Sequence, residues 1–197
     1  GGDHFVSYPL IKAHARKHGM PLSLLHFDAH SDLWHGYFEN KDTHGTPFRR
    51  ALEEGLIDPA RSSQIGLRGP LYDKDDFKMS KEAGLLAITG PELHKMGVKK
   101  ALPMVKERVG NGPAYLTFDI DFVDPAFAPG TGTPEAGGFT GYDSLALVRG
   151  LTDIEFIGYD LVEVMPAYDP AKITCLLAAN IIYEFITLIA LSKRAKT

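Results

Sequence analysis

The sequence predicts an α/β fold in which helices pack in layers around a mostly parallel sheet. Short runs of apolar and β-prone residues alternate along the chain with longer segments of helical character, an alternation typical of parallel sheets. Two of these runs, LSLLHF and AYLTF, contain few polar positions, as expected for strands buried on both faces. The 197 residues suffice for one domain with a hydrophobic core, and we expect residues 1–197 to form a single domain.

The first elements are a helix, a strand and a second helix. The helix covers residues 5–18 and ends at Gly19, because glycine readily adopts the left-handed conformation that closes helices. The strand covers residues 22–27. Thr46, as the N-cap, and Pro47, in the first turn, then predict a short helix that Gly55 closes.

The middle of the chain continues the alternation. In order, we expect a strand at residues 64–67, a charged surface helix at 73–83, a strand at 85–89, a helix at 102–109 and a strand at 114–118. Residues 124–140, DPAFAPGTGTPEAGGFT, are rich in Pro, Gly and Thr. Long loops in compact domains are usually functional, so we expect this loop to serve the site.

The C-terminal part adds a helix at residues 143–150, a buried strand at 154–164 and a long helix from 171 to about 192. The pair Asp169-Pro170 predicts the start of that last helix. The helix is apolar enough to suggest a membrane span. Asn180 and Glu184 lie in its middle, and no other such segment exists in the sequence, so we expect a buried or subunit-contacting helix and no membrane.

Composition narrows the class of protein. The formal net charge is -4 and no basic patch is interleaved with aromatic residues, which argues against nucleic-acid binding. The single cysteine excludes an internal disulfide framework and suits a reducing compartment. We therefore expect a cytoplasmic protein, or a mitochondrial one if a transit peptide precedes this chain. The chain opens on GGDH without Met, so we expect that residues precede it.

Two clusters of acidic residues follow predicted strands. Asp28, His30 and Asp32 alternate after the strand at residues 22–27, and Asp119 and Asp121 alternate after the strand at 114–118. Residues two apart on an extended chain face the same side, and α/β proteins build sites at the carboxyl ends of their strands. Carboxylates and imidazoles packed together are unfavourable unless a cation lies between them. The pattern therefore predicts a metal site.

His4, in the opening GGDH, offers a second imidazole. The candidate ligands are His4, Asp28, His30, Asp32, Asp119 and Asp121. Carboxylates with a minority of imidazoles and no thiolate favour Mn²⁺ over Zn²⁺. Six protein ligands exceed the need of one catalytic ion with open positions, so we expect two ions about 3.5–4 Å apart that share bridging carboxylates. Asp124, which precedes Pro125, is expected to cap a turn instead.

The segments GGDH, FDAHSD, TFDIDFVDPAFAPGTGTPE and DLVEVMPAYD resemble the ureohydrolase family of arginases and agmatinases over essentially the whole chain. Within that family, HGTPFRRALEEGLID, QIGLRG and DPAFAPGTGTP are most similar to agmatinases and agmatinase-like guanidino-acid hydrolases. The resemblance implies a three-layer α/β/α sandwich of the arginase/deacetylase type. Family members begin well before GGDH, so it also implies an N-terminally truncated fragment that lacks the first strands of the sheet.

The resemblance also assigns roles to residues. The six candidate ligands match those of a dinuclear manganese centre. His44 matches a histidine proposed as acid or proton shuttle, a role for which His35 is the only other candidate nearby. Glu163 matches the glutamate that pairs with the substrate guanidinium, and Asp32 would orient the attacking hydroxide.

The implied activity is hydrolysis of agmatine to putrescine and urea by a hydroxide that bridges two Mn²⁺ ions. The first alternative is a guanidino-acid hydrolase acting on 4-guanidinobutanoate or a similar acid, which Arg49 or Arg50 would favour if either reached the pocket. Less favoured alternatives are a zinc deacetylase of related fold, whose single metal needs fewer acids, and an inactive homologue. The resemblance further implies a homotrimer or homohexamer.

Overall fold

The computed structural model describes residues 2–37, 39–69 and 76–194, and in them it shows one parallel sheet. The strands are β1 (Ser23–Phe27), β2 (Ser63–Leu67), β3 (Leu86–Thr89), β4 (Ala114–Asp119) and β5 (Phe156–Val162). They lie in the order β3-β2-β1-β4-β5, and each pair of neighbours is parallel. Phe27 at the end of β1 is level with Phe118 near the end of β4. The acidic residues that follow these two strands therefore start at the same edge of the sheet.

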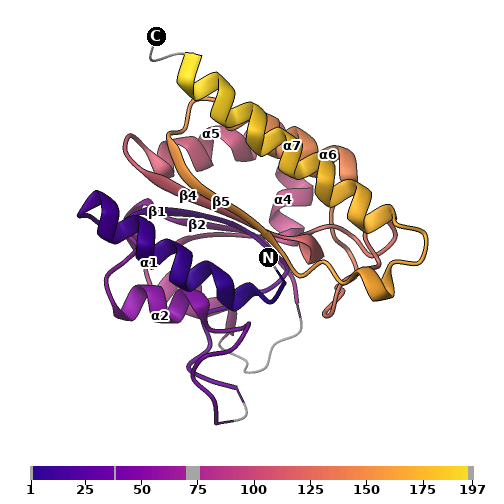
Figure 1. Ribbon diagram of the computed structural model, residues 1–197, viewed down its shortest axis with the longest axis horizontal. Helices are drawn as coiled ribbons and strands as arrows, with labels where there is room; N and C mark the ends of the chain where they lie inside the picture. The colour runs from indigo at the N-terminus through magenta and orange to yellow at the C-terminus, as the bar shows by residue number, and fades with distance from the viewer. Residues whose placement is uncertain (1, 38, 70–75, 195–197) are drawn as a thin grey trace.

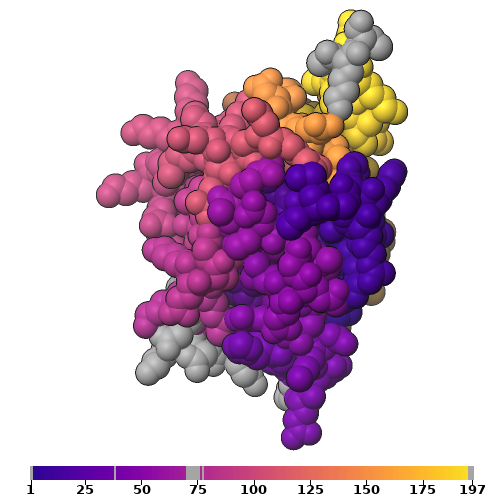
Figure 2. Space-filling model, turned by 90° about the vertical axis from the view of Figure 1, so that its left-hand side faces the viewer, coloured from indigo at the N-terminus to yellow at the C-terminus, as the bar shows by residue number. Residues whose placement is uncertain are grey.

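Helices cover both faces of the sheet, which confirms the predicted three layers (Figure 1). One face carries α1 (Ser7–His18) and α2 (Pro47–Glu53), and the other carries α4 (Gly90–Met96), α5 (Val98–Val109), α6 (Gly141–Arg149) and α7 (Ile173–Arg194). Each face has its own hydrophobic cluster, because both sides of the strands are apolar. Figure 2 shows the indigo N-terminal segment packed against the purple segment that contains α2.

One helix boundary and one capping bond differ from the sequence prediction, while α2 begins at Pro47 as predicted. A 3-10 turn, His4–Val6, precedes α1, and Gly19 closes α1 with φ 67° as predicted. Thr46 makes no side-chain capping bond to α2. Its hydroxyl instead donates to the carbonyls of Lys41 and Thr43, so it stabilises the loop before the helix.

Around β3 the prediction missed one helix. The α4 helix begins with a capping box in which the Thr89 hydroxyl and the Glu92 carboxylate each bind the other residue's backbone N–H. The sequence TGPE carried this signal. The following helix, α5, begins at Val98, before Pro103 rather than at it. Only part of the predicted helix at residues 73–83 falls within the described residues, as α3 (Asp76–Glu82).

The last helix is half buried rather than wholly buried. Thr174, Ala178, Ile181, Phe185 and Leu188 form the buried stripe of α7 at helical spacing, whereas residues such as Leu176 and Tyr183 are exposed. By length and composition alone, α7 is the one helix in the described part of the chain that could cross a membrane. Its buried stripe packs on β5 and α6, as the core helix of a layered protein does.

The start of α7 also differs from the expectation. The helix begins at Ile173, and Lys172 directly before it has φ 59°. Asp169 precedes the helix by four residues and caps it. Its carboxylate accepts hydrogen bonds from the backbone N–H groups of Thr174 and Cys175, at 3.3 and 2.8 Å.

Candidate metal centre

The six predicted ligands gather at the carboxyl ends of β1 and β4. His4 Nδ1 lies 3.2 Å from Asp28 Oδ2, 2.9 Å from Asp32 Oδ2 and 3.1 Å from Asp119 Oδ2. His30 Nδ1 lies 3.0 Å from Asp121 Oδ2 and 3.4 Å from Asp28 Oδ1. Asp28 thus faces both imidazoles with different oxygens. Two adjoining groups of side chains that could hold a metal ion share this carboxylate: His4, His26, Asp28 and Asp32 form one, and Asp28, His30 and Asp121 form the other.

The backbone after β1 is not extended, and turns in this loop bring its candidate ligands together. The Asp28 carboxylate accepts from the backbone N–H of His30 at 2.6 Å, which closes a turn. Asp32 has φ 52°, in the left-handed region. The expectation that three residues two apart would share one face of an extended chain was therefore wrong for Asp32, although its side chain does reach the cluster.

Tightly packed carboxylates and imidazoles perturb one another. Burial lowers the pKa of His30, but its hydrogen bonds with Asp121 and Asp28 outweigh burial and raise that pKa to about 12. Burial likewise opposes the raised pKa of His4, which comes from bonds with Asp119, Asp28 and Asp32. Burial and the charge of Asp28 raise the pKa of Asp121 to about 6. Without metal ions, the cluster therefore binds protons, and these protons offset part of the negative charge of its carboxylates.

One buried atom shows that these residues fit a metal. Three carboxylate oxygens surround His4 Nδ1 within 3.2 Å. One N–H can donate to at most one of them, so the remaining carboxylate charges face one another without compensation in a buried site. A divalent cation in contact with these atoms would supply that compensation.

Metal binding is expected to release protons. The raised pKa values of His4 and His30 mean that both imidazoles are protonated near neutral pH in the metal-free protein, and a metal ion must displace those protons. Affinity should consequently fall as the pH is lowered. Titration calorimetry in two buffers of different ionisation enthalpy measures the protons released, and a value of zero would contradict this account.

Four side chains that the sequence analysis did not single out form a hydrogen-bonded network behind His4. His4 Nε2 lies 2.9 Å from Thr117 Oγ1, whose hydroxyl donates to Asp160 at 2.5 Å. The buried Asp160 carboxylate also accepts from the hydroxyls of Ser7 and Tyr115, at 2.8 and 2.7 Å. An acid in the middle of the apolar strand GYDLV was the available signal, because such a residue needs buried partners.

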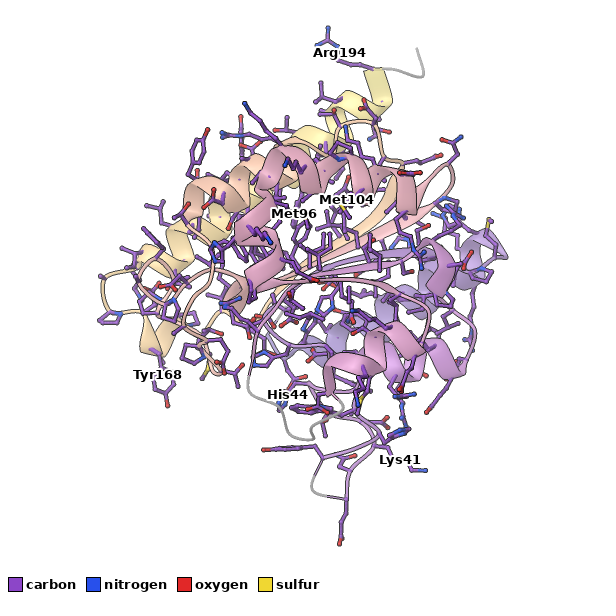
Figure 3. The ribbon with its side chains drawn as sticks, turned by 180° about the vertical axis from the view of Figure 1, so that it is seen from behind. Lys41, His44, Met96, Met104, Tyr168 and Arg194 are labelled. Atoms are coloured by element: carbon purple, nitrogen blue, oxygen red, sulfur yellow. The ribbon has the colours of Figure 1, made fainter. Side chains whose placement is uncertain are left out.

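A cavity of about 310 Å³ opens beside the cluster. Its described lining residues are His4, His30, Asp32, Trp34, Tyr37, His44, Asp119, Asp121, Thr133, Glu135 and Glu163. Two residues assigned through the resemblance, His44 and Glu163, are therefore brought to the site, whereas His35 is exposed and outside this set. Figure 3 shows His44 nearer to the sheet than Lys41.

Glu163 directly follows β5 and has φ 62°, so the backbone turns sharply where the strand ends. Its carboxylate accepts from the backbone N–H of His4 at 2.6 Å. Burial raises the pKa of Glu163, although this bond opposes the rise. Within the described residues the cavity lining contains no Lys or Arg, so no side chain of either type in that lining pairs with this carboxylate.

The long loop at residues 124–140 serves the site as predicted. Its Thr133 hydroxyl donates to Asp121 at 3.2 Å, and Glu135 lies 3.7 Å from His30 Nε2. Asp124 caps the turn, as expected, by accepting from the backbone N–H groups of Ala126 and Gly138.

The fold and this cluster define an α/β protein with a carboxylate–imidazole site at the edge of a parallel sheet. The chain belongs to the arginase family, whose family model matches residues 1–187. Guanidinopropionase of Pseudomonas aeruginosa is 48% identical over 96% of this chain, and agmatinase of Chromobacterium violaceum is 46% identical over all of it. The chain spans 59% of the length of each of these relatives.

Solved structures agree with this assignment. A hypothetical agmatinase from Burkholderia thailandensis has a TM-score of 0.89 and 45% identity, covering 100% of this chain and 59% of its own. Proclavaminate amidino hydrolase from Streptomyces clavuligerus has a TM-score of 0.90 and 42% identity, covering 97% of this chain and 62% of its own. The family predicted from the motifs is therefore confirmed.

Proposed function

We propose that the protein containing this chain hydrolyses the guanidinium group of agmatine, releasing putrescine and urea. The observation that carries the substrate class is the cavity lining. Besides the candidate metal ligands, the described lining contains two acids, Glu135 and Glu163, three aromatic or imidazole side chains and no Lys or Arg. A substrate that is positively charged at both ends suits such a pocket.

The metal centre would hold two Mn²⁺ ions. Its ligands would be His4 with the three carboxylates around its Nδ1 atom, Asp28, Asp32 and Asp119, and His30 and Asp121 on the other side of Asp28. The set contains oxygen and nitrogen donors and no sulfur, which favours Mn²⁺. Bound ions of this kind lower the pKa of water and make hydroxide available near neutral pH.

The chain's own side chains bind and orient the reactants. Glu163 would hold the planar guanidinium by charge-assisted hydrogen bonds, because its carboxylate lines the cavity and no Lys or Arg belongs to the described lining. Asp32 would accept a hydrogen bond from the attacking water. As the oxygen bonds to the guanidinium carbon, the bond from that carbon to the substituted nitrogen breaks. His44, on the cavity wall, would give a proton to the leaving amine.

The two arginines expected to favour an acid-bearing substrate if they reached the pocket are engaged elsewhere. Arg49 Nε donates to the Leu33 carbonyl at 2.9 Å. Arg50 donates to the His35 carbonyl and pairs with Glu53. Neither belongs to the described lining of the cavity, so neither would pair with a substrate carboxylate there.

A guanidino acid is the second candidate substrate. The relatives named guanidinopropionase and guanidinobutyrase are 48% and 46% identical to this chain, as similar to it as the agmatinases are. Sequence similarity therefore does not separate the two substrate classes, and the acids of the cavity lining support agmatine.

Urea release measured side by side on agmatine, 4-guanidinobutanoate, 3-guanidinopropanoate and arginine tests the proposal. The full-length protein is loaded with Mn²⁺, and Asp121→Ala is the inactive control. We expect agmatine to give the highest kcat/KM. A higher value for a guanidino acid would overturn the substrate assignment, and absence of urea from every substrate with metal bound would overturn the hydrolase.

A further inference from the structure

A second buried histidine lies beside the candidate metal ligands. His26 lies near the carboxyl end of β1, two residues before Asp28, and is fully buried with its ring centroid 4.3 Å from that of Phe48. Its Nε2 lies 2.6 Å from Asp28 Oδ2. At this place the ring could act as a metal ligand or as a hydrogen-bond donor to Asp28, and the position of its proton decides between them.

The side chain of Gln64, on the neighbouring strand β2, determines which ring nitrogen of His26 carries the proton. Gln64 Nε2 lies 2.6 Å from the backbone carbonyl oxygen of Ser31 and 2.8 Å from His26 Nδ1. A carbonyl oxygen only accepts hydrogen bonds, so the amide group facing it must be the NH₂. The amide oxygen, on the other side, accepts from the Ser80 hydroxyl at 2.6 Å. Every polar atom of the Gln64 amide therefore has a partner, in one orientation.

With this orientation, His26 Nδ1 accepts a hydrogen bond and the ring proton resides on Nε2. That proton is donated to Asp28 Oδ2. A protonated Nε2 has no lone pair for a metal, so His26 supports a ligand without being one.

The same amide group also holds the backbone of the metal-binding loop. Ser31 lies between His30 and Asp32, and Asp32 adopts a left-handed conformation that non-glycine residues rarely take. We propose that Gln64 and His26 are positioning residues of the metal centre: Gln64 anchors the loop at Ser31 and orients His26, which in turn orients Asp28. This inference rests on the proposed metal centre and is independent of the substrate.

The first test compares Mn²⁺ affinity in variants of the full-length protein. Gln64→Met keeps the length of the side chain and removes its N–H donors, and we expect Mn²⁺ binding roughly 10–100-fold weaker in competition with a chelator. Ser63→Ala is the matched control, because Ser63 is buried on the same strand and its hydroxyl has no partner among the described residues. Unchanged affinity in Gln64→Met would overturn the inference while leaving the hydrolase proposal intact.

The second test needs no variant. Nitrogen-15 NMR of histidine-labelled protein, metal-free and loaded with diamagnetic Zn²⁺, reports which ring nitrogen carries the proton. We expect His26 to bear it on Nε2 in both states. A proton on Nδ1, or an unprotonated Nε2, would overturn the inference even if Gln64→Met fails to fold. A wild-type protein that binds no divalent ion would instead refute the proposed metal centre.

Discussion

Replacing Asp28 with alanine is expected to abolish urea release. Asp28 is the residue shared by the two groups of candidate ligands, with one oxygen 3.2 Å from His4 Nδ1 and the other 3.4 Å from His30 Nδ1. Without it, the remaining acids on either side have no common bridge. Metal affinity should fall by more than the roughly 10–100-fold that changes outside the ligand shell cost. Metal content after gel filtration and urea release from agmatine are the measurements.

The control for this change is Asp153→Asn, which also removes one carboxylate. The Asp153 side chain is 79% exposed and pairs with Lys106 on the surface, and such pairs contribute little to stability. Metal content and activity should match the wild type. Two equivalents of metal retained by Asp28→Ala would refute the shared role of Asp28.

Replacing Glu163 with glutamine is expected to lower kcat/KM for agmatine by roughly 100-fold or more, since a lost charge-assisted bond to a buried cation typically costs about 3 kcal/mol. Glutamine keeps the shape of the side chain and an oxygen that accepts from the His4 backbone N–H, but it lacks the charge that a guanidinium would balance. Glu163 is not one of the candidate metal ligands, so metal content should stay at the wild-type level.

Steady-state kinetics with agmatine and metal analysis of the same preparation test this expectation. Glu107→Gln, an equivalent change at an exposed position of α5, provides the comparison. If Glu163→Gln retained the wild-type kcat/KM, Glu163 would not bind the guanidinium. If it lost metal as well as activity, its carboxylate would belong to the metal centre rather than to the substrate pocket.

Local patterns in the sequence predicted the layered fold because they act over short distances. The apolar runs of β1 and β4 identify strands buried on both faces, and Gly19 identifies the end of α1 through its own backbone preference. The missed helix α4 carried a readable local signal in its capping box. The predicted start of α5, at residue 102 next to Pro103, was too late, because the helix begins at Val98.

The sequence by itself determined which side chains form the candidate metal centre, because the acids that follow β1 and β4 reach the same edge wherever those strands pair in parallel. Only the tertiary structure decided what supports them. Gln64 meets His26, and Asp160 meets Thr117, across neighbouring strands at distances set by the strand register. Likewise, only folding turned Arg49 toward the Leu33 carbonyl and left the cavity wall acidic. Hydrogen bonds between residues far apart in the chain depend on register and side-chain direction, which no local pattern encodes.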